Sequence, residues 1–447
     1  MTPLYDNPLL SGWNEKPLAQ VVQLRRGYTW TKENEIDRPE DGAVPVIRIP
    51  NVQDSLDLTD LLYLRDVSPD ALERSAVSKG WILFVGSNGS QDRIGDSVLL
   101  EEDQPMVFAS FLMGMTSKDH DELLPEFLAN WMRIHLVHEW FSKTSQQTTG
   151  LANYSWGAVK KLPLRFPKDI NEQRRIAAAL KLADDAIAKA KAELEATREL
   201  KRSFARKVLE TGLSETELID SKFWKYPRTW DLVCVKHLLI GMDAGSSPMC
   251  ESYPAKPGQW GVLKVSAVSW ERFDEMENKA LPASIEPDLD AEIKVGDIIV
   301  SRANTTELCG AVHRVQSLYT RLLLCDKTWR LHPKEDVNPD WLVAVLKHPQ
   351  ARKQIEAIAT GTSDSMKNIG KRDFRNAVVP KPSRAEQDRI AESLNAFDAK
   401  IEVDIKKVEA LQQVKKSLLQ NLLTGKIRLP IEQGEALTAP TKEARYG

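Results

Sequence analysis

Apolar residues recur in two long segments, with steps that alternate between four and three positions. The first segment is 176–208 and the second is 390–422, and each apolar position of the first has a counterpart 214 residues later. Both series are interrupted by a lysine at the same step, Lys201 and Lys415. Such an alternation over ten positions is typical of a coiled coil. We therefore predict two long helices that pack on each other; the alternative is two unrelated surface helices.

The repeat continues into the sequence before each helix. Residues 46–52 align with 262–268, and residues 79–88 align with 295–304. These are apolar, β-branched runs bounded by Gly, Asn and Ser, so they predict strands that enter loops. A proline followed by an apolar-periodic stretch predicts a short helix later in each copy. The fold class is therefore α+β, with an internal repeat and two strand-rich domains separated by long helices.

The domain boundaries follow from these elements. We predict a first domain, a central helix, a second domain, a C-terminal helix and a disordered tail, at 1–168, 169–212, 213–382, 383–428 and 429–447. The tail is short on apolar residues, as chain termini often are.

Composition narrows the class of protein. The 447 residues are 42% apolar, and no run approaches 18 apolar residues, so no membrane span is expected. We see no secretory signal, and none of the four cysteines forms a C-x-x-C pair, which favours a reducing cytoplasm. Formal net charge is −3, with 16 Lys/Arg against 23 Asp/Glu in residues 1–165 and 22 against 23 in 213–380. A DNA-binding role would then need a local basic face or a positively charged partner.

We recognise no catalytic motif in the sequence. We find no phosphate-binding P-loop, no glycine-rich cofactor turn and no adenine-methyltransferase motif. The nuclease-like acids Asp288 and Glu292 lie only four residues apart, so we interpret them as a solvated acidic turn. His135 and His138 share a helix face but lack further metal ligands, so we interpret them as surface histidines. We expect no catalytic residue and no metal site in this chain.

The duplicated order of motifs resembles one family, the specificity (S) subunits of Type I restriction–modification systems. The motifs are the Glu-Gln-x-Arg-Ile helix starts at 172–176 and 386–390, the strand–loop segments at 79–88 and 295–304, the Gly-Thr…Asn-Ile segment at 361–369 and the closing segment at 422–428. The resemblance covers residues 10–428. It implies two target recognition domains that each read half of a split, double-stranded DNA sequence. It also implies an antiparallel helix pair that separates them and docks two methyltransferase subunits.

The resemblance implies further partners and cofactors. Restriction subunits would join through the complex, in a cytoplasmic system of phage defence. This chain would hold no cofactor, and S-adenosylmethionine, ATP and Mg²⁺ would belong to the adenine-N6 methyltransferase and ATP-dependent endonuclease partners.

Sequence readout in DNA requires polar side chains on loops that can enter a groove, with Arg suited to guanine and Asn or Gln to adenine. The candidates are polar or aromatic residues that follow predicted strands or precede the closing strand of each copy: Arg48, Ser87, Asn88, Ser90, Gln91, Arg93, Gln146, Tyr154, Lys264, Ser301, Arg302, Asn304, Thr305, Thr306, Ser363, Lys367 and Asn368. Two alternatives remain open. Surface loops are polar in any protein, and the segments near 146 and 363–368 could instead cap the strand that precedes each long helix.

Two other function classes are compatible with these patterns. One is a protein-binding scaffold in which the coiled coil fixes the spacing of two globular domains, and the acidic first domain suits it. The other is a nuclease that uses Asp288 and Glu292, which we regard as the weakest alternative. Neighbouring genes for an adenine methyltransferase and a helicase-nuclease would favour the DNA-specificity role.

Overall fold

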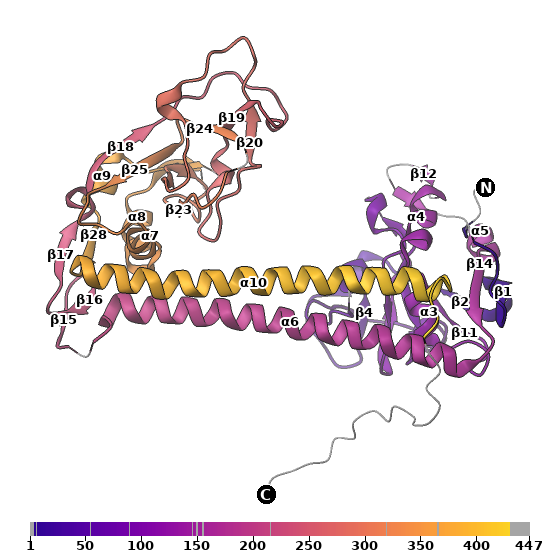
Figure 1. Cartoon of the computed structure of the whole chain (residues 1–447). Helices are drawn as coiled ribbons and strands as arrows, with labels where there is room; N and C mark the ends of the chain where they lie inside the picture. The colour runs from indigo at the N-terminus through magenta and orange to yellow at the C-terminus, as the bar shows by residue number, and fades with distance from the viewer. Residues whose placement is uncertain are drawn as a thin grey trace, which may run out of the picture. The chain divides into compact units, whose positions relative to one another are not determined.

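The chain folds into two compact units in a computed structural model (Figure 1). The model describes residues 4–5, 7–53, 55–88, 90–144, 146–148, 151–153, 156–214, 216–318, 320–363 and 366–429. Unit 1 comprises Met1–Lys191 and Lys406–Gly447, and unit 2 comprises Ala192–Ile405. Each unit therefore contains one strand-rich part and half of each long helix. Residues 430–447 of the predicted tail lie outside the described residues.

The two predicted helices are present, as α6 (Ile170–Thr211) and α10 (Arg384–Leu423). Each starts after a capping residue: Asp169 Oδ1 accepts a hydrogen bond from the Asn171 N–H at 2.9 Å, and Ser383 Oγ accepts one from the Glu386 N–H at 3.4 Å. Each helix is followed by a glycine with positive φ, 72° at 212 and 73° at 425. That conformation favours glycine and ends a helix, so α10 stops short of residue 428.

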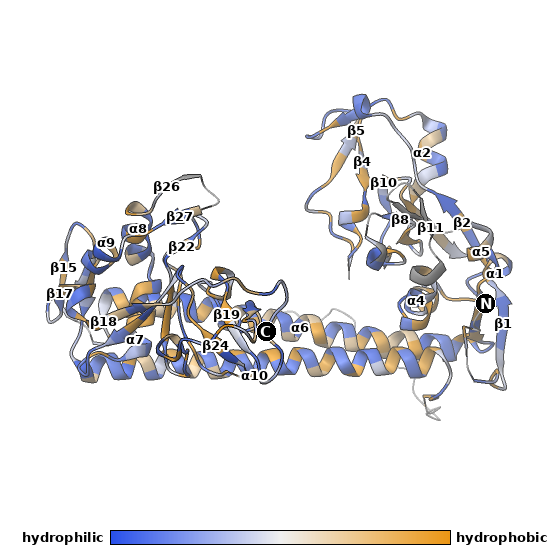
Figure 2. Cartoon of the chain, turned by 90° about the horizontal axis from the view of Figure 1, so that it is seen from above, coloured by the Kyte–Doolittle hydropathy of each residue, from blue (hydrophilic) through white to orange (hydrophobic). Residues whose placement is uncertain are grey.

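The helices pack antiparallel within each unit, which confirms the coiled-coil prediction. In unit 1, Lys415 forms an ion pair with Asp184, and in unit 2 Lys201 forms one with Asp398. These two pairs are the same interaction in the two copies, because both partners are offset by 214 residues. The buried apolar seam positions include Ile176, Leu180, Ile187, Ala190 and Val208 on α6, and Ile390, Leu394, Val408 and Leu422 on α10. Figure 2 shows that apolar and polar segments of the ribbon alternate along both helices.

The helix-start motif Glu-Gln-x-Arg-Ile has a structural role in both copies. Gln173 is fully buried; its Oε1 accepts from the Leu124 N–H at 2.9 Å and its Nε2 donates to two backbone carbonyls at 2.8 Å. Gln387 is also fully buried; it accepts from the Asn338 N–H at 2.8 Å and donates to the Pro382 carbonyl at 3.0 Å. The glutamine thus joins the start of each long helix to the short helix predicted from a Pro-led turn.

Among its described residues, unit 1 contains four groups of paired strands and five short helices. The four-stranded sheet has the order β2 (Val22–Arg26), β11 (Leu112–Ser117), β7 (Ile82–Val85), β9 (Ser97–Leu99). The five-stranded sheet has the order β3 (Glu35–Ile36), β5 (Leu62–Leu64), β4 (Val44–Ile47), β10 (Gln104–Phe108), β6 (Ala76–Val77). The smaller groups are β12 (Gln146–Thr148), β13 (Leu151–Asn153), β8 (Ser87–Asn88) and the pair β1 (Trp13–Pro17), β14 (Pro163–Pro167). The helices are α1 (Leu18–Val21), α2 (Pro69–Ser75), α3 (Pro125–Met132), α4 (His135–Thr144) and α5 (Trp156–Lys161).

Unit 2 repeats this plan. The four-stranded sheet has the order β18 (Leu239–Ala244), β25 (Thr328–Pro333), β21 (Ile298–Ser301), β23 (Val312–Arg314). The three-stranded sheets are β20 (Asn278–Ala280), β19 (Trp260–Leu263), β24 (Arg321–Leu323) and β22 (Ala303–Asn304), β27 (Met366–Asn368), β26 (Thr360–Ser363). The pairs are β17 (Asp231–Cys234), β28 (Val378–Lys381) and β15 (Leu218–Asp220), β16 (Lys225–Pro227). The helices are α7 (Pro339–Lys347), α8 (Pro349–Ala357) and α9 (Lys371–Asn376).

The strand orders show that the internal repeat extends through the globular parts. The order β2-β11-β7-β9 corresponds to β18-β25-β21-β23, and β8-β13-β12 corresponds to β22-β27-β26. One parallel pair recurs as well, β4 with β10 and β19 with β24. Strands β3 and β6 extend the larger sheet of unit 1 only.

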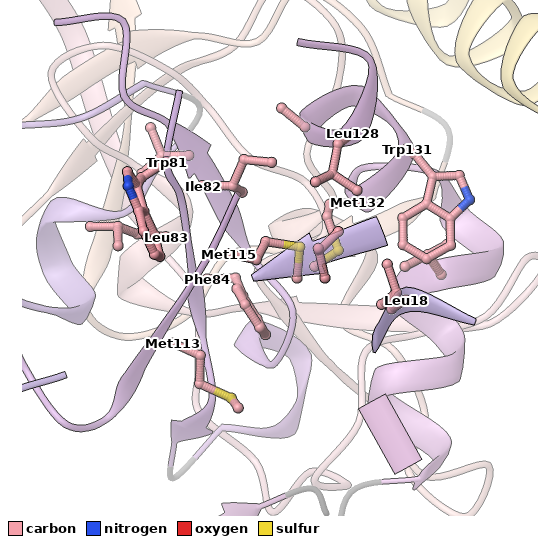
Figure 3. Close-up of a cluster of buried hydrophobic side chains, with 14 of the residues drawn as sticks. Leu18, Trp81, Ile82, Leu83, Phe84, Met113, Met115, Leu128, Trp131 and Met132 are labelled. Atoms are coloured by element: carbon pink, nitrogen blue, oxygen red, sulfur yellow. The ribbon is translucent and has the colours of Figure 1, made fainter. Parts of the chain in front are cut away.

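Each unit has its own apolar core. In unit 1 the side chains of β7, β11 and α3 meet around Phe84, Met115 and Trp131, all fully buried (Figure 3). In unit 2, Trp224, Trp341 and Phe374 are the largest fully buried side chains. No helix among the described residues is long and apolar enough to cross a membrane.

Candidate nucleic-acid interface

Two segments that the sequence singled out separately form one small sheet in each unit. In unit 1, β8 pairs with β13, so that Asn88 lies opposite Ala152, and β13 pairs with β12. In unit 2, β22 pairs with β27, so that Asn304 lies opposite Lys367, and β27 pairs with β26 (Figure 2). We call these three-stranded groups the small sheets. They bring the loop after a core strand next to the segment that precedes the last strand pair.

Arg302 lies between the core sheet and the small sheet of unit 2. Its carbonyl accepts from the Ile369 N–H at 2.9 Å, and its Nη1 donates to the Asp326 carbonyl at 3.4 Å. The guanidinium carbon is 5.8 Å from the Trp329 ring centroid, and its Nε is buried without a hydrogen-bond partner in the described structure. Thr305 and Thr306 follow β22 and are exposed. An arginine beside exposed hydroxyls is chemistry suited to base edges.

Two other candidates of this segment are buried. Ser301 has no exposed surface, and Asn304 is only 8% exposed. Asn304 Nδ2 donates to Ser301 Oγ at 3.3 Å and to the Val265 carbonyl at 3.5 Å, while its Oδ1 accepts from the Thr305 N–H at 2.9 Å. These bonds shape the loop, so Asn304 positions its neighbours. DNA contact by either residue stays a prediction.

The second strand of the small sheet in unit 2 carries Lys367 and Asn368, both half-buried. Lys367 Nζ donates to the Gly361 carbonyl at 3.0 Å, and the Asn368 carbonyl accepts from Thr360 Oγ1 at 3.3 Å. The backbone of Ser363 is part of β26, and its side chain lies outside the described residues.

Arg48 and Lys264 occupy the same place in the two copies, directly after β4 and β19. Arg48 Nη2 lies 3.4 Å from Asp60 Oδ2, and Lys264 Nζ lies 3.6 Å from Glu277 Oε2. A hydrogen bond from Ser266 and the charge of Lys264 lower the pKa of Glu277. Each cation is therefore paired with an acid of its own unit, in ion pairs too exposed to contribute much stability.

In unit 1, the loop after β8 corresponds to the loop after β22 in unit 2, and Arg93 fixes it. Its Nε donates to Asp96 Oδ2 at 2.9 Å and its Nη2 to the Val52 carbonyl at 2.7 Å. Burial opposes ionisation of Asp96, but hydrogen bonds from His138 and Arg93 outweigh burial and lower the pKa of that carboxyl. His138 Nε2 lies 3.4 Å from Asp96 Oδ1, and this hydrogen bond raises the pKa of His138. His138 is thus a partner of an acid rather than a free surface group.

The remaining candidates of unit 1 are less well defined. Ser87 is 9% exposed, Asn88 belongs to β8, and Ser90 is exposed. The side chains of Gln91 and Gln146 lie outside the described residues, although their backbones belong to a 3-10 turn and to β12. Tyr154 lies wholly outside the described residues.

The sequence analysis missed a basic depression on unit 2. It has a volume of about 570 Å³ and is lined by Lys236, Lys371, Arg372, Arg375 and Asn376. Four of the five residues belong to α9, which starts three residues after β27 ends. The sequence signal was available, because two arginines and a lysine lie within five positions of 371.

The acidic turn that resembled a nuclease site has an internal role. Asp288 Oδ1 accepts from the Asp290 N–H at 3.1 Å, and the buried Arg330 donates to the carbonyls of Asp290 and Glu292, both at 2.7 Å. Within the described ranges no three His, Cys, Asp or Glu side chains lie close enough together to hold a metal ion.

Comparison with known proteins agrees with this geometry. The profile of the Type I restriction modification DNA specificity domain matches residues 10–196. The EcoEI specificity subunit of Escherichia coli is 31% identical over 181 residues, which are 40% of this chain and 30% of that protein. The putative MjaX specificity subunit of Methanocaldococcus jannaschii is 24% identical over 93% of this chain and 94% of its own length. The EcoKI specificity subunit of Escherichia coli K12 is 25% identical over 94% and 89%.

Solved structures share the fold. An S subunit of a Type I restriction-modification system from M. genitalium has a TM-score of 0.52 at 14% identity and covers 94% of this chain and 99% of its own. A chain from a study of complex assembly and conformational transition of the type I R-M system has a TM-score of 0.57 at 13% identity, covering 94% and 100%. The fold is that of a duplicated protein in which each unit carries a small sheet. Over most of its length the chain is similar to Type I restriction–modification specificity subunits, and its residues 10–196 match the DNA specificity domain of that family.

Proposed function

We propose that the chain recognises a bipartite sequence in double-stranded DNA and performs no catalysis itself. The observation that carries this proposal is the small sheet that recurs in both units with the same strand order and different side chains. A shared framework with different loops suits two modules that read different sequences. Polar loops that can reach base edges suit duplex DNA. Proteins that bind single strands stack the bases on aromatic side chains, and exposed aromatic pairs are few here.

A domain exchange tests the bipartite target. Residues 1–165 are replaced by the equivalent domain of a relative, and the methylated motif is read by methylome sequencing. We expect one half of the motif to change while the other half and the gap remain. The reciprocal exchange of residues 213–380 is the matched control and should change only the other half. Simultaneous change of both halves by either exchange would contradict the modular assignment.

Arg302 is the candidate for direct base readout in unit 2. We expect Arg302→Ala to weaken binding to the cognate duplex by roughly 1–3 kcal/mol and to relax one base position, because a bidentate contact to guanine is lost. Arg228→Ala, at an exposed arginine of unit 2 outside the small sheet, is the matched control. Binding is measured at one fixed salt concentration on cognate and random duplexes. An equal loss on both duplexes would assign Arg302 to phosphate contact instead.

We propose that the helix pair sets the gap between the two half-sites. Helix α6 has 42 residues, about 63 Å at 1.5 Å per residue. Inserting four residues into one helix adds about 6 Å and leaves the apolar seam as a stutter. The expected motif has unchanged halves and a gap longer by about one or two base pairs, at 3.4 Å per step. A folded, active insertion variant that methylates the original gap would contradict this role.

The helix pair also carries the proposed docking surface for two methyltransferase subunits. Leu200 and Val414 are 60% and 53% exposed, and they occupy equivalent positions 214 residues apart. Repeated exposed apolar residues favour two equivalent contacts. We expect Leu200→Asp and Val414→Asp each to release one methyltransferase subunit, measured by the mass of the co-purified complex. Leu182→Asp, at a 65% exposed position whose counterpart is the smaller Ala396, is the control.

The catalytic work is assigned to partners in this proposal. S-adenosylmethionine, ATP and Mg²⁺ would bind the methyltransferase and restriction subunits, and the complex would act in the cytoplasm. We expect methyl transfer only after a methyltransferase subunit is added to the purified chain. Methylation or cleavage by the chain alone, abolished by Asp288→Ala, would contradict the assignment.

The protein-binding scaffold remains as a second candidate because residues 1–165 carry a net charge of −7. An acidic domain is repelled by the phosphate backbone unless local cations or a partner compensate. Binding of a duplex with the methylated motif, tested with the methyltransferase subunits present, separates the two. A scaffold would show no preference for that duplex over a random one.

A further inference from the structure

The basic depression on unit 2 is open to solvent and unusually rich in positive charge. Its lining comprises Lys236, which belongs to a 3-10 turn (Val235–His237), together with Lys371, Arg372, Arg375 and Asn376 of α9. Four of these five side chains are cations. The charge is therefore concentrated on one face of a six-residue helix and the turn that packs on it.

Two of the cations are oriented by oxygen atoms of neighbouring elements. Lys371 Nζ donates to the Met242 carbonyl of β18 at 2.6 Å, and Lys236 Nζ donates to Asn376 Oδ1 at 3.3 Å. Arg372 and Arg375 are exposed, and neither forms an ion pair or a hydrogen bond with any side chain in the part of the chain that the structure describes. The buried Phe374 between them fixes α9 on the core.

Two other arginines of unit 2 are paired with carboxylates. Arg314 Nη1 lies 2.7 Å from Asp340 Oδ2, and Arg330 Nη2 lies 3.0 Å from Asp243 Oδ2. Four cations around one depression without such pairing repel each other, and an external anion relieves that repulsion. A guanidinium group also matches the geometry of a phosphate through two parallel hydrogen bonds. A polyanion with regularly spaced phosphates fits this arrangement.

The helix that lines the depression follows the small sheet of unit 2 along the chain. Only Ile369 and Gly370 separate β27 from α9, and the Ile369 N–H donates to the carbonyl of Arg302 at 2.9 Å. If Arg302 contacted base edges in a groove of the DNA, the phosphates of the duplex would lie along both borders of that DNA groove. The cations of α9 are therefore next to the place where a backbone strand would pass.

We propose that this depression binds the phosphate backbone of the duplex that unit 2 reads, and that it supplies affinity independent of sequence. This inference rests on the proposed function and names the residues that hold the DNA strand. The equivalent helix of unit 1, α5, also carries two cations, Lys160 and Lys161, but has Trp156 where α9 has Lys371 and Gly157 where α9 has Arg372. The Arg26 guanidinium lies 5.1 Å from the Trp156 ring. The pair of arginines is therefore a feature of unit 2.

The test uses the full chain in complex with its methyltransferase subunits. Binding to a duplex that contains the methylated motif, and to a random duplex of equal length, is measured across a series of NaCl concentrations. For Arg372→Gln/Arg375→Gln we expect the same fold-loss of affinity on both duplexes. We also expect the slope of log K against log salt to become shallower by about 2, because roughly one counterion is released per phosphate contact.

Two matched variants define the result. Arg372→Lys/Arg375→Lys keeps the charge and should retain the wild-type salt slope. Lys222→Gln/Lys294→Gln removes the same charge at two exposed positions outside the depression and should also leave the slope unchanged. None of these side chains is buried, so all variants should fold.

Three outcomes would overturn the inference. The first is an unchanged salt slope in the glutamine variant, and the second is a loss of affinity confined to the cognate duplex, which would make the arginines base readers. The third is loss of a methyltransferase subunit while DNA affinity is retained. The last outcome would identify an acidic protein surface as the occupant. Failure of the proposed function appears separately, as a wild-type complex that binds both duplexes equally. The salt slopes on the random duplex still test the depression in that case.

Discussion

At the junction between long helix and globular domain, the two units differ in the groups that hydrogen-bond to the same glutamate. Glu172 accepts from the Trp13 indole at 3.4 Å and from Arg428 Nε at 2.9 Å. Glu386, its counterpart, accepts from the Trp230 indole at 2.9 Å and from the Leu213 N–H at 3.3 Å. Besides the indole, the hydrogen-bond donor to this glutamate is a guanidinium group in unit 1 and a backbone amide in unit 2. Duplication therefore preserved the acid and the tryptophan, while the third group was free to diverge.

A second difference lies at the ends of the two long helices. The segment from Val208 to Gly212 is one residue longer than its counterpart from Leu422 to Gly425, and Glu210 is the added residue. Its Oε1 lies 3.3 Å from Nε2 of His348, whose side chain is 1% exposed and packs against Trp224 at 4.6 Å between ring centroids. Unit 2 thus contains a buried histidine next to a partly exposed glutamate, and the corresponding segment of unit 1, 422–425, lacks that glutamate.

The largest effect is expected from removing the buried glutamine of either junction. Gln173→Ala and Gln387→Ala each leave a backbone N–H and two carbonyls unsatisfied and create a small cavity, at a cost of about 3–5 kcal/mol in the unfolding free energy. Each variant should destabilise its own unit only. Hydrogen exchange followed by mass spectrometry reports the two units separately. Equal loss of protection in both units would show that they do not unfold independently.

The buried histidine predicts a pH dependence confined to unit 2. Burial lowers the pKa of His348 to about 4, opposed by the charge of Glu210 and reinforced by that of Arg206. Between that pKa and the ordinary histidine value of about 6.5, the unfolded chain binds a proton that the folded unit excludes. The free energy of unfolding of unit 2 is therefore highest above about pH 6.5 and decreases as pH falls toward 4. The loss is at most roughly 3 kcal/mol in unfolding free energy.

Unit 1 has a histidine of opposite behaviour. The hydrogen bond to Asp96 raises the pKa of His138, so its contribution is present at low pH and is lost as pH rises through that pKa. Unfolding curves followed by hydrogen exchange between pH 4 and 7 should show unit 2 weakening first on acidification. His348→Gln should flatten that response, whereas His138→Gln should leave it unchanged. An acid response that survives His348→Gln would assign it to other groups.

Replacing Arg428 tests whether the guanidinium group stabilises the Glu172 junction of unit 1. Arg428→Gln leaves the carboxylate of Glu172, 5% exposed, with only the Trp13 indole, and we expect unit 1 to lose about 1–2 kcal/mol. The estimate lies below that for a fully buried pair because the Arg428 side chain is 51% exposed. A variant in unit 2 with the same loss of charge, Arg228→Gln, serves as the control. A loss of the same size in the control would make the effect one of net charge.

These contrasts also show what the sequence could predict. The helix pair, the strand-rich domains and the repeat were predictable because a coiled-coil seam and paired strand motifs are local patterns. The convergence of residues 87–88 with 151–153, and of 303–304 with 366–368, was not, because strand pairing joins segments about 60 residues apart. Burial of Ser301 and Asn304 was equally hidden, since a polar residue after a strand looks the same whether it faces solvent or its own loop.

The smallest effect is expected from the two ion pairs that the repeat preserved. Lys201 with Asp398 and Lys415 with Asp184 are partly exposed, at 30% and 20% for the lysine side chains. Exposed pairs contribute about 0.2–1 kcal/mol, and the less exposed Lys415 pair should lie at the upper end. Double-mutant cycles with Lys→Met and Asp→Asn measure each coupling energy in the unfolding free energy. Because both pairs lie in helix seams, methionine can also gain apolar contact, so the single Lys→Met changes should be close to neutral. A coupling above about 2 kcal/mol in either pair would show that the seam lysines hold the helices together rather than fix their alignment.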